Sequence, residues 1–189
     1  MEQDERLLAA AEAFALPSYA QPHRAYHDAD HVRAVLGALD SRGLLTLPLA
    51  LAAWGHDLVY DPRAADNEER SADMFGAWLR EQRASPGLEA EVRALILATR
   101  HTAPPVTRGE ALLVDADLSI LGADAQAFAA YDTAIQQEYG FVPGEAYRAG
   151  RSRVLRSFLD RGRIFTTPEF AGLEGRARVN LTAALARLE

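Results

Sequence analysis

The sequence predicts an all-α fold of about eight helices in a single domain spanning residues 1–189. Hydrophobic residues make up 49% of the chain, and alanine and leucine dominate among them, which favours helices over strands. Glycines and prolines stand mainly between segments of helical periodicity, where they end helices. No segment has the pattern of a strand, an internal repeat or a low-complexity linker. A chain of this length can bury a substantial core.

The boundaries of the helices follow from capping residues, glycines and prolines. Pro17 and Pro22 end the first helix, and Gly43 closes the second. A helix over about 109–124 runs directly into the next one, which Gly140 closes. The expected ranges are about 3–14, 28–41, 46–60, 66–83, 86–102, 109–124, 124–139, 143–162 and 168–188.

The stretch 44–60, LLTLPLALAAWGHDLVY, is apolar at almost every position. This pattern is typical of a central, buried helix rather than a surface one. Thr46 and Pro48 mark its start, and His56 and Asp57 stand near its C-terminal end. Burying a polar or charged group without a partner costs several kcal/mol. Both side chains therefore need a partner, and a metal ion is a candidate for both.

Composition excludes several classes of protein. The chain has no cysteine, which rules out disulfides, zinc fingers and thiol nucleophiles, and all twenty basic residues are arginine, which rules out lysine chemistry. The net charge is −7 and no basic stripe is present, so nucleic acid is not an expected partner. No apolar run is long enough to span a membrane, and the acidic N-terminus is unlike a signal peptide. We therefore expect a cytoplasmic protein without a membrane partner.

Histidines offer the first candidate ligands. His31 shares a helical stripe with Val32, Val35 and Leu39, so its imidazole is expected to face the core. A lone histidine in such a place is more often a hydrogen-bonded core residue than a ligand. His27 lies one turn earlier and ranks second, because it falls at or before the helix start.

Two pairs of acidic residues, Asp115/Asp117 and Glu68/Glu69, are each expected to have one side chain that faces inward. Asp117 falls within an apolar stripe and is expected to be buried, whereas Asp115 is expected to be solvated or to support a ligand from behind. With Asp66 as N-cap, Glu69 completes a capping box. Glu68 faces inward on the same helix, and favourable placement in a helix start, worth under about 1 kcal/mol, does not account for its burial. We therefore favour a functional role for Glu68.

Two basic residues near apolar positions have open interpretations. Arg151 shares a face with Val154, Leu155 and Phe158, and a buried arginine needs a carboxylate or a phosphate in its fork. A structural pair with an acid is at least as good an explanation as a substrate clamp. His101 ends its helix, where a cation suits the dipole, but it could also reach into a site.

The inward-facing His31, His56, Asp57 and Asp117 supply two imidazoles and two carboxylates without sulfur. Such a set suits one divalent ion of manganese, iron, nickel, cobalt, zinc or magnesium, with water completing the coordination. The order His … His-Asp … Asp resembles the HD superfamily of metal-dependent phosphohydrolases, and is most similar to its small bacterial members. Matching stretches lie along most of the chain, namely YHDADH, WGHDLVYDP, DNEERSA, ILATRH, DADLSILG and GRSRVL.

The resemblance implies an HD-type helical domain and a hydrolase of phosphoric esters. It implies His31, His56, Asp57 and Asp117 as metal ligands and Asp57 or Glu68 in catalysis. Arg151 and His101 are the expected substrate-binding residues. The implied substrate is a small phosphorylated molecule, with a nucleotide favoured, and self-association into a homo-oligomer is compatible with it. An ion would lower the pKa of a bound water to about 7 and hold a phosphoryl oxygen.

One departure from the family concerns the number of metals. Two-metal members carry further histidines after the His-Asp pair, but here Asn67 stands where such a histidine often lies, so we expect one metal. Two competing hypotheses stay open. One is a metal- and nucleotide-binding sensor domain without turnover, and the other is a helical interaction protein in which each inward polar group is merely paired.

Overall fold

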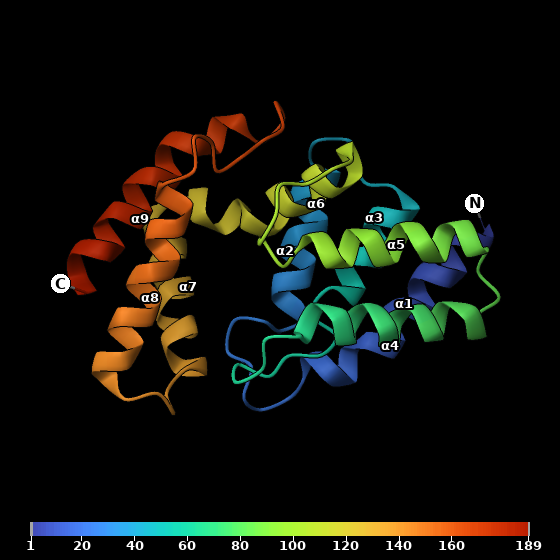
Figure 1. Cartoon of the computed structure of the whole chain (residues 1–189). Helices are drawn as coiled ribbons and strands as arrows, with labels where there is room; N and C mark the ends of the chain where they lie inside the picture. Colours follow the sequence, from blue (N-terminus) through green and yellow to red (C-terminus); the bar gives the residue numbers. More distant parts are fainter. Residues whose placement is uncertain (1, 189) are drawn as a thin grey trace. The chain divides into compact units, whose positions relative to one another are not determined.

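The structure is a computed structural model that describes residues 2–188 (Figure 1). Nine α-helices and two short 3-10 helices make up its regular structure, and no strand occurs among these residues. The predicted all-α class is therefore confirmed. No helix within 2–188 is long and apolar enough to cross a membrane.

The helices form two compact units, one ending at Ala116 and the other beginning at Asp117. The boundary falls at the last residue of α6, Arg108–Asp117. All of α6 before Asp117 therefore belongs to the first unit. The expectation of a single domain over 1–189 stays a prediction, and each unit is described by itself below.

Helix α3, Leu47–Gly55, is the centre of the first unit. Every residue of α3 from Leu49 to Gly55 is buried, as predicted for a helix that is apolar all round. Four other helices pack against it. They are α1 Glu2–Tyr19, α2 Ala29–Asp40, α4 Asn67–Glu81 and α5 Pro86–Ala98.

Helix α3 ends at Gly55, so the prediction that it continues to Tyr60 is wrong. His56 is its C-cap residue, and Asp57 lies in the irregular turn that follows. The reason lies in the hydrogen bonds of this turn. The carbonyls of Asp57 and Leu58 accept from the guanidinium of Arg24, instead of from amides of a further helical turn.

The predicted end of the first helix before Pro17 is also wrong, because α1 runs through Pro17 to Tyr19. A proline inside a helix removes one backbone hydrogen bond. The extra turn compensates by burying Tyr19, whose hydroxyl donates to the carbonyl of Trp54 at 3.0 Å.

The second unit contains η1 Leu118–Gly122, α7 Ala125–Glu138, α8 Gly144–Leu159, η2 Ala171–Leu173 and α9 Glu174–Leu188. Helix α9 packs against the other four elements. It begins later than the predicted position 168, because the carboxylate of Glu174 accepts from the amides of Ile164 and Phe165 and so holds a loop ahead of the helix. Asn180 of α9 donates to the carbonyls of Leu121 and Ala123.

The close packing of α3 generates a stability prediction. A Cβ at Gly55 would lie 2.8 Å from Cγ of Phe75 and from Cδ1 of Ile96, both fully buried side chains. Gly55→Ala should therefore lower the free energy of unfolding by about 1–3 kcal/mol, as overpacking of a core does. Chemical denaturation followed by circular dichroism measures this.

Gly37 of α2 is the matched control, because a Cβ there meets no atom within 4 Å. Gly37→Ala should raise the free energy of unfolding by about 0.5–1 kcal/mol, since alanine is the better helix former. Equal effects of the two substitutions would contradict this description of the α3 packing.

Candidate metal centre

His31 enters the site from the first turn of α2. The carboxylate of Asp28 caps this helix by accepting from the amides of Asp30 and His31 at 2.9 and 3.2 Å. The cap fixes the start of the helix and hence the direction of His31. The predicted inward stripe is confirmed, because His31 is buried together with Val32, Val35 and Leu39.

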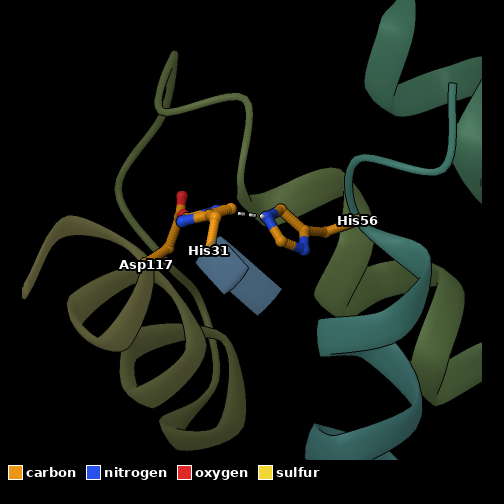
Figure 2. Close-up of side chains that lie close together, drawn as sticks. All are labelled: His31, His56 and Asp117. Atoms are coloured by element: carbon orange, nitrogen blue, oxygen red, sulfur yellow. Dashed lines mark hydrogen bonds between the residues drawn. The ribbon is translucent and has the colours of Figure 1, made fainter. Parts of the chain in front are cut away.

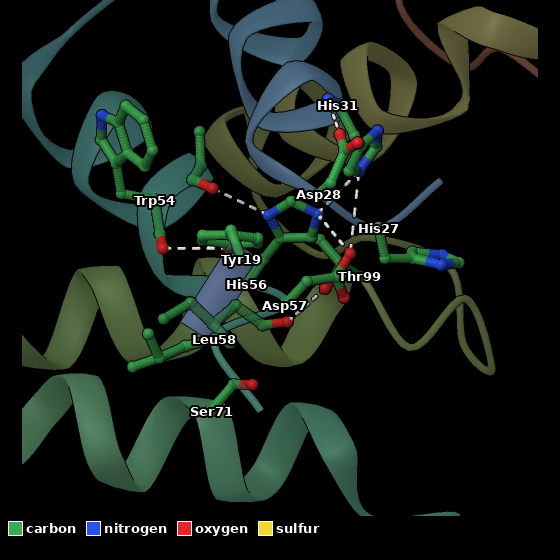
Figure 3. Close-up of polar contacts among 12 residues, drawn as sticks. Tyr19, His27, Asp28, His31, Trp54, His56, Asp57, Leu58, Ser71 and Thr99 are labelled. Carbon is green, nitrogen blue, oxygen red and sulfur yellow. Dashed lines mark hydrogen bonds and ion pairs between the residues drawn. The ribbon is translucent and has the colours of Figure 1, made fainter. Parts of the chain in front are cut away.

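His56 enters from the end of α3 and is only 2% exposed. Its Nδ1 lies 2.9 Å from the carbonyl oxygen of Ala53 (Figure 3). A carbonyl can only accept, so Nδ1 must donate the proton of this bond. In the neutral imidazole, the lone pair is then on Nε2, which points into the site. A backbone bond of this kind commonly orients histidines that bind metals.

Three ligand atoms of the first unit meet at one point. Nε2 of His31 and Nε2 of His56 lie 3.1 Å apart. Oδ2 of Asp57 lies 3.1 Å from Nε2 of His56 and 3.7 Å from Nε2 of His31. The turn after α3 thus brings the neighbouring residues His56 and Asp57 to the same point, although on a regular helix they would diverge.

Asp117 is the last residue of α6, so the end of that helix sets where its carboxylate lies. One ligand atom each from His31, His56 and Asp117 lies within 4.8 Å of the others, and this group could hold a metal ion (Figure 2). Its histidines are buried and Asp117 is half-buried. The three residues therefore come from the ends of three helices, α2, α3 and α6.

The separations fit a divalent cation. With metal–nitrogen distances of about 2.0–2.1 Å, two ligands at octahedral or tetrahedral angles lie about 2.9–3.4 Å apart. The two 3.1 Å separations fall in this interval, and the 3.7 Å separation corresponds to a wider angle. Imidazole nitrogen and carboxylate oxygen together suit the divalent ions of manganese, iron, cobalt, nickel and zinc.

Positive charge in this site is favourable for Asp57. Burial by itself raises the pKa of this carboxyl, but the charge of His56, a hydrogen bond from His56, and the charges of His27 and His31 together hold the pKa well below its ordinary value. Because the neutral ring of His56 keeps its proton on Nδ1, only the protonated ring can donate from Nε2, and it donates to one neighbour at a time. A cation placed between the three atoms contacts all of their lone pairs at once.

Glu68 lies half-buried in the first turn of α4. Its pKa is raised above the ordinary value, chiefly by burial and then by the negative charges of Asp57 and Glu69. The expected capping box is not formed, because the side chain of Asp66 makes no capping hydrogen bond, and Glu69 forms an ion pair with Arg100.

The amide of Asn67 is occupied by the backbone of Asp61. Its Oδ1 accepts from the amide of Asp61 at 3.0 Å, and its Nδ2 donates to the carbonyl of Asp61 at 2.9 Å. The side-chain amide of Asn67 is therefore used to hold the loop that follows the His-Asp turn. The expectation of one metal stays a prediction.

Asp115 is fully buried, so the expectation that it could be solvated is wrong. Every residue of α6 from Leu112 to Ala116 is buried, and the helix has no polar face in this stretch to turn outward. The alternative, that Asp115 supports a ligand from behind, stays a prediction. Asp117 is half-buried instead of fully buried as expected.

Two other histidines of the first unit lie at helix boundaries. The ring of His27 stacks on Tyr60, with centroids 4.2 Å apart, and lies 5.8 Å from the ring of His31. His101 follows α5 with a left-handed backbone, φ 56°. The expected role of His101 in substrate binding stays a prediction.

In the second unit, the guanidinium of Arg151 is buried and paired. It donates from Nη2 and Nε to Oδ1 of Asp132 at 3.0 and 3.3 Å, and lies 5.2 Å from the centroid of the Tyr131 ring. Of the two sequence-based interpretations, the structural pair with an acid is thus observed, and the acid is Asp132. Its assignment to substrate binding stays a prediction.

Sequence reasoning missed Arg24, which is 8% exposed and bonds to the backbone of the His-Asp turn. The only local signal is its place in PHRAYH, beside aromatic and histidine side chains. Helical periodicity gives no information about a residue in a loop, so burial of this arginine could not be read from the pattern.

The geometry predicts that a divalent cation is lost when the charge of Asp57 is removed. Asp57→Asn keeps the shape of the side chain but removes the anionic ligand, and should weaken binding of Zn²⁺ or Mn²⁺ at least about 10-fold. Isothermal titration of the metal-free protein measures the affinity.

Asp124→Asn is the matched control, because Asp124 caps α7 and asparagine caps helices equally well. Its metal affinity should equal that of the wild type. Unchanged affinity in Asp57→Asn would exclude Asp57 as a ligand.

Comparison of the chain with protein-family models, with curated proteins and with solved structures found no match. The resemblance to the HD superfamily therefore rests on the motif residues alone and stays a prediction.

Proposed function

We propose that the chain is a metal-dependent phosphohydrolase that acts on a small phosphorylated molecule, with a nucleotide as the favoured substrate. The observation that supports this proposal is the meeting of Nε2 of His31, Nε2 of His56 and a carboxylate oxygen of Asp57 within 3.7 Å. Hydrolysis of phosphate esters is a reaction for which such a site is well suited, since it needs both an activated water and neutralisation of negative charge.

His31, His56, Asp57 and Asp117 would hold the ion. When bound, a divalent cation supplies Lewis-acid activation of water and neutralises charge on a phosphoryl oxygen. The Oδ2 atom of Asp57 faces the two imidazoles, so Asp57 acts as a ligand in this proposal. Its carboxylate would also keep the imidazoles in their orientation.

Glu68 is the proposed proton acceptor. Its side chain lies in the first turn of α4, where burial and the negative charge of Asp57 raise its pKa. It is half-buried, so a proton held there is partly shielded from bulk water. General-base assistance of this kind contributes about 10²- to 10⁴-fold to a rate.

Glu68→Gln should lower kcat for a phosphate ester at least about 100-fold while the bound metal stays at the wild-type level. The measurement is phosphate release from a panel of nucleotides and sugar phosphates with Mn²⁺ present, combined with metal analysis of each variant. The glutamine keeps the size of the side chain, so only proton transfer is affected.

Glu69→Gln is the control, because the neighbouring carboxylate is used in the ion pair with Arg100. It should leave kcat within about 3-fold of the wild type, since surface ion pairs contribute little. A wild-type rate in Glu68→Gln would remove Glu68 from the mechanism. Metal binding by the wild type without turnover of any ester would favour the sensor hypothesis instead.

A further inference from the structure

Arg24 is a buried arginine outside the set of candidate ligands and proton acceptors. Its guanidinium lies over two aromatic rings, 5.0 Å from the centroid of Tyr19 and 5.4 Å from that of Tyr60. Its Nε donates to the side-chain oxygen of Gln21 at 3.1 Å. Contacts with two rings and a hydrogen bond at Nε restrict the orientation of the guanidinium.

The remaining donors of Arg24 hold two separate backbone segments together. Nη1 donates to the carbonyl of His27 at 2.9 Å and to that of Asp57 at 2.7 Å, and Nη2 donates to the carbonyl of Leu58 at 3.1 Å. The first segment leads into α2, which carries His31. The second is the turn after α3, which carries Asp57.

The rest of this turn is held by other side chains. Ser71 of α4 accepts from the amide of Val59 at 2.9 Å, and His23 bonds to the carbonyl of Tyr60 at 2.9 Å. Asn67 binds both backbone groups of Asp61. Backbone outside a helix needs such partners when it is buried, because an unpaired carbonyl is costly. Arg24 provides such partners for the carbonyls of Asp57 and Leu58.

We propose that Arg24 is a positioning residue of the metal centre, whose planar fork sets the distance between the His31 segment and the His-Asp turn for a divalent cation. This inference rests on the proposed metal-binding function. A lysine could not replace it, because a compact ammonium cannot satisfy three carbonyls in one plane.

The test compares the affinity of metal-free proteins for Zn²⁺ and for Mn²⁺ by isothermal titration. Arg24→Gln and Arg24→Lys should both weaken binding about 10- to 100-fold, the usual effect of losing a group that orients ligands. Gln21→Ala, which removes only the bond to Nε, should weaken it less than either. This milder variant and Arg24→Lys carry the test if Arg24→Gln does not fold.

Arg178 offers a matched control in the second unit. It donates to the carbonyls of Leu159, Arg161 and Gly162 and to Glu174, so it binds a loop in the same way as Arg24. Arg178→Gln should lower the melting temperature about as much as Arg24→Gln but leave metal affinity within about 3-fold of the wild type. If Arg24 served stability alone, Arg24→Gln and Arg178→Gln would have the same effect on metal affinity as well as on the melting temperature.

Each other outcome overturns a defined part of the proposal. Wild-type affinity in both Arg24 variants would show that the turn holds its ligands without the arginine. Full affinity in Arg24→Lys alone would assign the effect to charge instead of fork geometry. Equal weakening in Arg178→Gln would make the effect global. No binding by the wild type would overturn the metal centre itself, whereas the first three outcomes leave it standing.

Discussion

The structure around α3 depends on one electrostatic constraint, which is that two imidazole nitrogens and one carboxylate oxygen meet at one point. The bond from Nδ1 of His56 to Ala53 leaves Nε2 facing Oδ2 of Asp57 and Nε2 of His31. These three atoms lie this close without repulsion only when a proton or a metal cation lies between them. The positive charge of protonated imidazoles around Asp57 likewise favours its anionic form and holds its pKa below the ordinary value.

The candidate ligands lie at the ends of helices and not along their faces. His31 lies in the first turn of α2, His56 is the C-cap of α3 and Asp117 is the last residue of α6. At the end of a helix the backbone can leave the helical repeat. The side chains of adjacent residues such as His56 and Asp57 can then point to the same place. The cost is irregular backbone in the core, and side chains such as Arg24 satisfy its carbonyls.

The sequence was informative wherever a regular helix decides the direction of a side chain. The stripe of α2 gave the burial of His31, and the continuous apolar run gave the central place of α3. It failed where tertiary hydrogen bonds replace helical ones, as in the turn after Gly55 and at buried Arg24. It also failed at Asp115, because a helix enclosed on all sides has no outward stripe.

The metal stoichiometry of the wild-type protein tests the metal centre most directly. Metal-free protein is titrated at neutral pH with Zn²⁺ and with Mn²⁺, and the heat of binding is measured. A metal centre at His31 and His56 should bind one ion per chain, with affinity that falls as the pH is lowered, because protons compete for the imidazoles. Titrations that show no saturable binding of either ion would contradict it.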